Sequence, residues 1–320
     1  MYEKVYFEYP SKKSTLPLFE ASMKHKNLFY FLLFIGMIAW GGAWVNTKIV
    51  SHYVNAYDVI FIRYGIAAIS MIPLLYIFKK SFYISFKNIV LVLVASGVLI
   101  AYMVYFFLGT KYGMASLGGA LVTSLIPMDT FFILALMRVK KIGKKQLFAL
   151  MIGMLGVLTM LNVWKLNMQE VLVIQNLYFL LAAFLWAVLT IISSKAKHIS
   201  PLVFTFYMYV IVSVVAGVWF VDFDSIAYES LDSRFWLNML LMTFGATTFT
   251  NTVYFLGVER LGAAEVSSFI FLVPFSAIGL SAIFLHEPIS PSMIIGTFMT
   301  LYAVKILNNI TFFKHKHPSN

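Results

Sequence analysis

The run LFYFLLFIGMIAWGGAWVNTKIV, residues 28–50, decides the fold class. It contains one basic side chain, Lys48 near its end, and no acidic one. A helix of about 20 apolar residues is long enough to cross the hydrocarbon core of a bilayer. The run follows 27 mostly polar residues and is longer than the apolar core of a secretory signal. We therefore interpret it as a first membrane span rather than a cleaved leader.

Nine further apolar windows of similar length follow this run. The ten windows cover residues 28–50, 57–78, 88–109, 116–137, 146–164, 174–194, 201–221, 236–256, 264–285 and 290–310. The chain is 61% hydrophobic and only 12% charged, with a mean hydropathy of +0.87, whereas soluble domains contain about 25% charged residues. Strand-like alternation is absent from the windows, and helices satisfy their own backbone groups in lipid. These features predict an all-α integral membrane protein with ten transmembrane helices.

Lysine and arginine are distributed unequally between the two sides of the predicted membrane. With the connections numbered alternately, the side that holds the N-terminus carries 18 basic residues and the other carries Lys111, Lys165 and Arg234. The positive-inside rule then places both termini in the cytoplasm, as tails over residues 1–27 and 311–320. It also explains the net charge of +11 without nucleic acid as a partner. We expect a multi-pass protein of the cell membrane, with a bacterial inner membrane favoured.

Three motifs recur in the same order in the two halves of the chain. Each pair below is separated by 146 to 149 residues. The pairs are Trp40 with Trp186, Tyr105-Phe-Phe-Leu-Gly109 with Tyr254-Phe-Leu-Gly257, and Gly113 followed by Pro127 with Gly262 followed by Pro274. Five spans per half is an odd number, so the two repeats, residues 28–164 and 174–310, are predicted to be inserted in opposite orientations. Inverted repeats of this kind occur in secondary transporters, whose substrate site lies between the halves.

These motifs resemble the ten-helix, EamA-type members of the drug/metabolite transporter superfamily. The resemblance covers residues 28–310. It rests on Trp40-Gly41-Gly42, Lys48, Arg63, the stretch from Gly113 to Pro127, Trp186, Lys195, the stretch from Gly262 to Pro274, and Leu285-His286-Glu287-Pro288. His286 stands where the family has glycine, and Met137-Arg138-Val139, the matching place in the first half, lacks the acid. The resemblance implies transport of metabolites, amino acids or toxic organic compounds, often as proton-linked export or exchange.

Ionisable residues inside the windows are candidate functional groups, because charge is costly in the membrane interior. Asp129 lies near the middle of its window, two residues after Pro127. We expect it to bind a cationic solute or a proton, with a protonated or paired structural acid as the alternative. Arg63 is a candidate for a substrate carboxylate; the alternatives are snorkelling to the outer interface and pairing with Asp58.

The remaining candidates are aromatic, amide and helix-breaking residues. Trp40, Trp44, Tyr102, Tyr105, Trp186, Asn251 and Tyr254 are the candidate substrate contacts, and Pro127, Pro274, Gly113 and Gly262 are the candidate gating positions. Aromatic rings can stack on planar or cationic solutes, although helix packing explains any single ring equally well. Asn251 belongs to a polar run from Thr243 to Thr252, and lipid offers its amide no partner.

The sequence argues against several other classes of function. It has no cysteine, no phosphate-binding loop with Lys-Ser/Thr, and no clustered catalytic or metal-ligating side chains, so we predict no enzyme, cofactor or metal site. The leading hypothesis is a secondary transporter of a small organic solute, exporting it by alternating access, with protons as a candidate coupling ion. The alternatives are an uptake carrier or exchanger and, less favoured, a lipid scramblase, an intramembrane enzyme or a channel.

Overall fold

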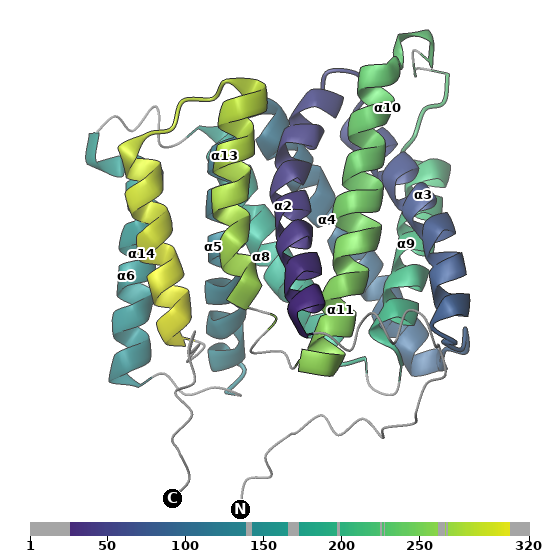
Figure 1. The fold of residues 1–320 in the computed structure, drawn as a ribbon, viewed down its shortest axis with the longest axis horizontal. Coiled ribbons are helices and arrows are strands. Elements are labelled where there is room, and N and C mark those ends of the chain that lie inside the picture. Colours follow the sequence, from purple (N-terminus) through teal and green to yellow (C-terminus); the bar gives the residue numbers. More distant parts are fainter. Residues whose placement is uncertain are drawn as a thin grey trace, which may run out of the picture.

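The computed structural model describes residues 26–307 apart from 139–142, 166–172, 197–198, 225, 227, 262–265 and 267. Within these residues every regular element is helical (Figure 1). In the first half the elements are α2 (Lys26–Val50), α3 (Ala56–Ile77), α4 (Phe86–Tyr112), α5 (Ala115–Leu136), α6 (Lys144–Met160) and the 3-10 turn η1 (Val163–Lys165). In the second half they are α8 (Ile174–Ser194), α9 (Pro201–Trp219), η2 (Tyr228–Ser230), α10 (Ser233–Leu240), η3 (Leu241–Phe249), α11 (Thr250–Leu261), η4 (Ser268–Leu272), α13 (Val273–Leu285) and α14 (Pro291–Leu307).

Six of the described helices are long and apolar enough to cross a membrane. They are Leu28–Val50 of α2, α3, α4, α5, α8 and α9. Two apolar helices, α13 and α14, are shorter. The 17 residues of α14 span about 26 Å at 1.5 Å per residue, somewhat less than the ~30 Å hydrocarbon core. The all-helical membrane fold is therefore established, while the count of ten crossings stays a prediction.

Within the described residues, each predicted window coincides with helical structure, but several boundaries and helix types differ from the prediction; residues 264, 265, 267 and 308–310 of the last two windows lie outside the described residues. α4 continues to Tyr112, beyond the predicted end at 109, and only two residues separate it from α5. The window 264–285 holds a 3-10 turn, η4, followed by α13. Pro274 is consequently the second residue of α13 rather than a mid-helix break, whereas Pro127 lies inside α5.

The two halves pack together in a pattern that is preserved when the halves are exchanged. α3 packs against α9, α5 against α13, and α6 against α14; these are the pairs that correspond in the repeat. In the repeat, α2 corresponds to α8, and α4 corresponds to η3 with α11. The contact between α4 and α8 is therefore repeated as the contact of α2 with η3 and α11, and the contact between α2 and α13 is repeated as the contact between α8 and α5. The chain just after α13 contacts the first turn of α5. These two packed and corresponding helices therefore run in opposite directions, as an inverted repeat requires.

A π-helical segment interrupts the helix that runs from α10 to α11. It is η3, which contains the first part of the polar run noted in the sequence, Thr243 to Thr248, while Thr250, Asn251 and Thr252 begin α11. Two threonine hydroxyls bond back to carbonyls five residues earlier, Thr247 Oγ1 to Met242 O at 3.1 Å and Thr250 Oγ1 to Gly245 O at 2.7 Å. The corresponding helix of the first half, α4, is α-helical throughout. π-helical turns are rare and are often found at functional sites, so η3 directs attention to its neighbours.

The first turn of α2 and the last turn of α14 lie at the same end of the helix bundle (Figure 1). The opposite end carries the α2–α3 connection, the start of α5 and the start of α10 (Figure 1). We call this opposite end the outer end, following the orientation predicted from the basic residues.

Candidate functional site

Arg63 of α3 lies inside the bundle and contacts the π-helical segment. Its side chain is 8% exposed, and its Nε donates a hydrogen bond of 2.9 Å to Thr247 Oγ1. The guanidinium carbon lies 5.7 Å from the ring centre of Tyr64. A threonine of η3 therefore binds Arg63, the charged residue that lies inside the predicted window 57–78.

Two further tyrosines and an asparagine join Arg63 and Tyr64. The rings of Tyr64 and Tyr209 are 4.9 Å apart, and Asn251 Nδ2 donates a hydrogen bond to Tyr209 Oη. Tyr102 of α4 is also buried, and it belongs to the same buried core as Tyr64 and Tyr209. We call Arg63, Tyr64, Tyr102, Tyr209, Thr247 and Asn251 the central cluster. Its members come from both halves of the chain.

Aromatic rings extend from one side of the central cluster. The ring centres of Tyr102 and Trp186 lie 4.7 Å apart, and those of Tyr102 and Phe106 lie 5.8 Å apart. Trp44 packs 4.4 Å from Phe106 and 6.0 Å from Phe179. Two of the predicted aromatic contacts, Tyr102 and Trp186, therefore touch each other, and Trp44 lies behind them, against Phe106.

Trp40 and Tyr254 form a separate pair. Their ring centres are 5.5 Å apart, and Trp40 Nε1 donates a hydrogen bond of 2.8 Å to the carbonyl of Ala246 in η3. Although Trp40 and Trp44 are one turn apart on α2, their ring contacts are with different partners. Trp40 supports the π-helical segment, whereas Trp44 belongs to the aromatic wall.

Other predicted residues lie apart from the central cluster. Tyr105 pairs with Tyr178 at 5.9 Å. Asp129 is partly exposed, and its carboxylate has no hydrogen-bond partner among the residues that the structure describes. Gly113 ends α4 in an extended conformation, and Gly262 lies outside the described residues.

The predicted alternative of an Arg63–Asp58 pair is wrong. Asp58 Oδ2 accepts the backbone N–H of Asn55 at 3.0 Å and completes the capping box that starts α3. Asp58 Oδ1 has no hydrogen-bond partner among the described residues. Arg63 is turned towards Thr247 instead, and it does not snorkel to the outer surface, because it is buried.

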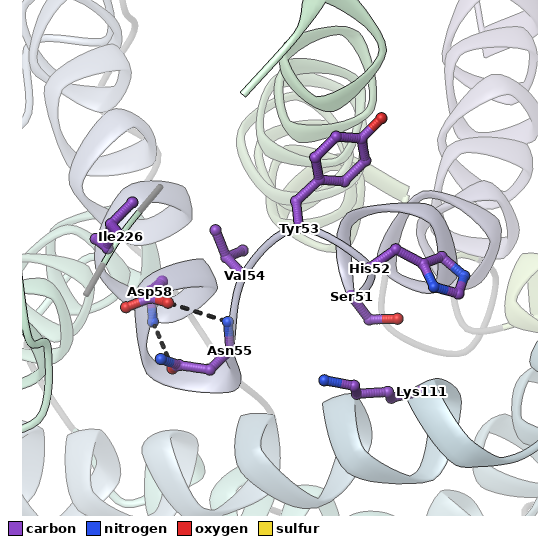
Figure 2. A pocket seen from close by; sticks show the side chains of 8 residues that line it. All are labelled: Ser51, His52, Tyr53, Val54, Asn55, Asp58, Lys111 and Ile226. Atoms are coloured by element: carbon purple, nitrogen blue, oxygen red, sulfur yellow. Dashed lines mark hydrogen bonds between the residues drawn. The ribbon is translucent and has the colours of Figure 1, made fainter. Parts of the chain in front are cut away.

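Asp58 and Lys111 line a pocket at the outer end. Figure 2 shows this cavity of about 210 Å³, with Lys111 reaching from α4 towards the turn that joins α2 to α3. Its lining residues are Ser51, His52, Tyr53, Val54, Asn55, Asp58, Lys111 and Ile226. A second cavity, of about 360 Å³, also lies at this end; Lys48, Gly113, Asn176 and Glu287 are among its lining residues.

Lys48 and Glu287 hold the α4–α5 turn from two sides. Lys48 Nζ donates to the carbonyls of Lys111 and Gly113 at 2.9 and 2.6 Å, at the end of α4. The Glu287 carboxylate accepts the backbone N–H groups of Ala115 and Ser116, both at 2.8 Å, at the start of α5. A cation at a helix C-terminus and an anion at a helix N-terminus both match the helix dipole.

Asp232 caps the helix that begins at the outer end. Its Oδ1 accepts the backbone N–H of Phe235 at 2.8 Å, and its Oδ2 accepts a hydrogen bond of 3.1 Å from Tyr53 Oη. Mainly because of the Phe235 bond, the pKa of Asp232 lies below its ordinary value of 3.8. The carboxylate thus stabilises the fold above pH 3.8, and this contribution is lost as the pH falls through the lowered pKa.

We expect Asp232→Ala to lower the thermal midpoint at neutral pH, because alanine cannot cap α10. Asp232→Asn retains a capping oxygen and should stay close to the wild type at neutral pH, while lacking the acid-dependent loss. Thermal unfolding in detergent between pH 3 and 7 measures both effects, with Glu229→Ala on the exposed turn η2 as the control. Equal midpoints for Asp232→Ala and the wild type would refute the capping role.

Tyr64 and Tyr209 are members of the central cluster that the sequence reasoning missed. Both are hydroxyl-bearing residues inside apolar windows, and Tyr64 directly follows Arg63 in the chain. Neither lies in a repeated motif, which is why the comparison of the two halves passed over them. A search for hydroxyls near window centres would have included them together with many unrelated residues.

Comparisons with known proteins agree with this architecture. The model of the EamA-like transporter family matches residues 27–162 and again residues 173–309. Two relatives from Bacillus subtilis (strain 168) are the "Uncharacterized transporter YoaV", 23% identical over 87% of this chain and 96% of its own, and the "Uncharacterized transporter YyaM", 26% identical over 88% and 93%. One solved structure, described as "Crystal structure of protein", has a TM-score of 0.59 at 15% identity and matches 88% of this chain and 96% of that one.

Proposed function

Because the chain belongs to the EamA-like transporter family, we propose that it is a secondary carrier moving a small organic solute by alternating access. Membership makes it a multi-pass transporter of the cell membrane, with nothing in its relatives' names to indicate an enzyme. The central cluster is the proposed solute site. Export and proton linkage are part of the proposal and derive from the resemblance to the drug/metabolite transporter superfamily.

The observation that carries this proposal is that both halves contribute to one buried polar cluster. Arg63 and Tyr102 belong to the first half, and Tyr209, Thr247 and Asn251 to the second. In inverted-repeat carriers the halves move against each other around a site between them. A site made from both halves would change its access when the halves move.

Flux through reconstituted protein tests the proposal. Purified protein in liposomes is assayed with amino acids, nucleosides, organic cations and carboxylic acids, in both directions and with or without a pH gradient. Protein-dependent flux that saturates with solute concentration is the expected result. Lipid flipping without flux of any solute class would overturn the proposal and support a scramblase.

Asp129 is the proposed proton site. It is an acid within α5, and its carboxylate has no hydrogen-bond partner among the described residues. We expect Asp129→Asn to remove the stimulation of flux by a pH gradient, while exchange of solute against solute continues. The measurement is flux with and without the gradient, and Thr130→Ser on the same helix is the control. Unchanged pH dependence in Asp129→Asn would remove this residue from the mechanism.

A further inference from the structure

The central cluster contains an excess of hydrogen-bond donors and no acid. Arg63 uses only its Nε, towards Thr247, and no carboxylate lies within ion-pairing distance of it among the described residues. The N–H groups on both of its terminal nitrogens therefore have no protein acceptor in that part of the chain. Neither terminal nitrogen is among the fully buried polar atoms that lack a hydrogen-bond partner, so both retain some exposed surface.

The tyrosine hydroxyls beside Arg63 add to this excess. Tyr64, Tyr102 and Tyr209 are 4%, 9% and 3% exposed. The hydroxyl of Tyr209 accepts a bond from Asn251, which leaves its own proton to donate. The hydroxyls of Tyr64 and Tyr102 make no hydrogen bond within the described residues. The guanidinium carbon of Arg63 lies 5.7 Å from the ring centre of Tyr64, and the ring of Tyr209 lies 4.9 Å from that of Tyr64, so these two tyrosines line the same side of the cluster as the guanidinium.

A buried guanidinium without a counter-ion is energetically unfavourable. The cost of removing a cation from water is offset when an anion and further hydrogen bonds complete its shell. Charges inside a membrane protein accordingly pair with each other or mark the path of a substrate. Here the structure provides the cation and the donors, and the missing partner is an anion.

We infer that the transported solute is an organic anion whose carboxylate binds the terminal nitrogens of Arg63. This inference rests on the proposed transport function. The planar fork of a guanidinium matches the two oxygens of a carboxylate, and the tyrosine hydroxyls donate to the lone pairs that remain. A single cation in the cluster balances a single negative charge, which favours a carboxylate over a doubly charged phosphate.

The aromatic wall indicates what accompanies the carboxylate. Trp186 and Phe106 pack against Tyr102, and Trp44 packs behind Phe106. Apolar and aromatic surfaces next to a few polar groups are the usual lining of a small-molecule site. The body of the solute is thus apolar or planar, with its acid directed towards α3.

Binding measured without transport tests this inference. The thermal midpoint of detergent-solubilised protein is followed with benzoate, indole-3-acetate and succinate, each against the corresponding amide, and with inorganic phosphate. At least one acid should raise the wild-type midpoint while its amide does not. Arg63→Gln should weaken the apparent affinity for that acid by roughly 10- to 100-fold, and Arg63→Lys by less. Arg234→Gln, on the exposed start of α10, is the matched control and should bind as the wild type does.

Identical shifts for acids and amides, or acid binding that survives Arg63→Gln, would overturn the carboxylate assignment. Stabilisation by phosphate alone would overturn it as well. The two proposals fail separately. Arg63-dependent acid binding without flux would contradict transport, whereas flux of neutral solutes only, unaffected by Arg63→Gln, would contradict the anion site and leave transport intact.

Discussion

Replacing Gly41 with alanine is expected to destabilise the folded protein by about 1–3 kcal/mol, or to prevent its accumulation. A Cβ at this position would overlap the side chain of Ser276 and lie 2.7 Å from the backbone nitrogen of Ala277. Backbone atoms cannot rotate away as a side chain can, so α13 would have to move from α2. A hydrogen bond also joins the two helices here, because Ser276 Oγ of α13 donates to the carbonyl of Met37 on α2 at 3.1 Å.

Two other glycines provide matched controls for Gly41→Ala. A Cβ at Gly97 on α4 or at Gly279 on α13 would meet no atom within 4 Å. Alanine favours the helix over glycine, so Gly97→Ala and Gly279→Ala should keep or raise the thermal midpoint. The readouts are the midpoint in detergent and the yield of monodisperse protein. If Gly41→Ala behaves as these controls do, close approach of α2 and α13 is not required for folding.

The helices could be predicted because lipid imposes a simple length requirement. About 20 apolar residues per crossing produce windows that are visible in one sequence. The window 174–194 matches α8 in both of its boundaries. The end of α4 was placed too early, at 109, because Lys111 and Tyr112 interrupt the apolar run although the backbone stays helical. Hydropathy reports which residues tolerate lipid, whereas a helix ends where its hydrogen bonds end.

The π-helical segment could not be predicted from residue types. Its threonines indicated a polar stretch, but bonding between residues five apart depends on how η3 packs against α2 and α3. Only part of the central cluster could be predicted, because tertiary packing also decides which residues meet there. Arg63, Tyr102 and Asn251 were proposed from their residue types and, for Arg63, from the family resemblance, yet they lie on three different helices, α3, α4 and α11. Which hydroxyls would surround Arg63 was decided by tertiary packing, and so Tyr64 and Tyr209 were missed.

His286, at the outer end, begins a turn whose long-range contact could not be predicted from the sequence. This residue has φ of 55°, in the left-handed region that favours glycine. The resemblance to the family had placed a glycine here, and the conformation explains that preference. The turn brings Glu287 back towards α5, a long-range contact that no local pattern in the sequence indicates.

Replacing Glu287 with alanine is expected to destabilise the protein by about 3 kcal/mol. Met114, at the N-cap of α5, makes no side-chain capping bond, so Glu287 supplies the acceptor from the other half of the chain. Its carboxylate also accepts from Ser116 Oγ at 2.5 Å. Hydrogen bonds to a charged group are worth about 1.5–3 kcal/mol each, and they are not additive when one carboxylate makes all of them.

A graded series separates the cap from the general effect of losing an acid. Ser116→Ala removes only the hydroxyl bond to the carboxylate and should cost about 1.5 kcal/mol, less than Glu287→Ala. Glu287→Gln keeps one oxygen as an acceptor and should fall between them. Glu229→Ala removes an exposed acid and should leave the thermal midpoint unchanged. The loss in Glu287→Ala has a second source, because Lys48 then remains partly buried beside the turn without the opposite charge that acts on it. A Glu287→Ala protein that melts with the wild type would show that α5 needs no cap from the second half of the chain.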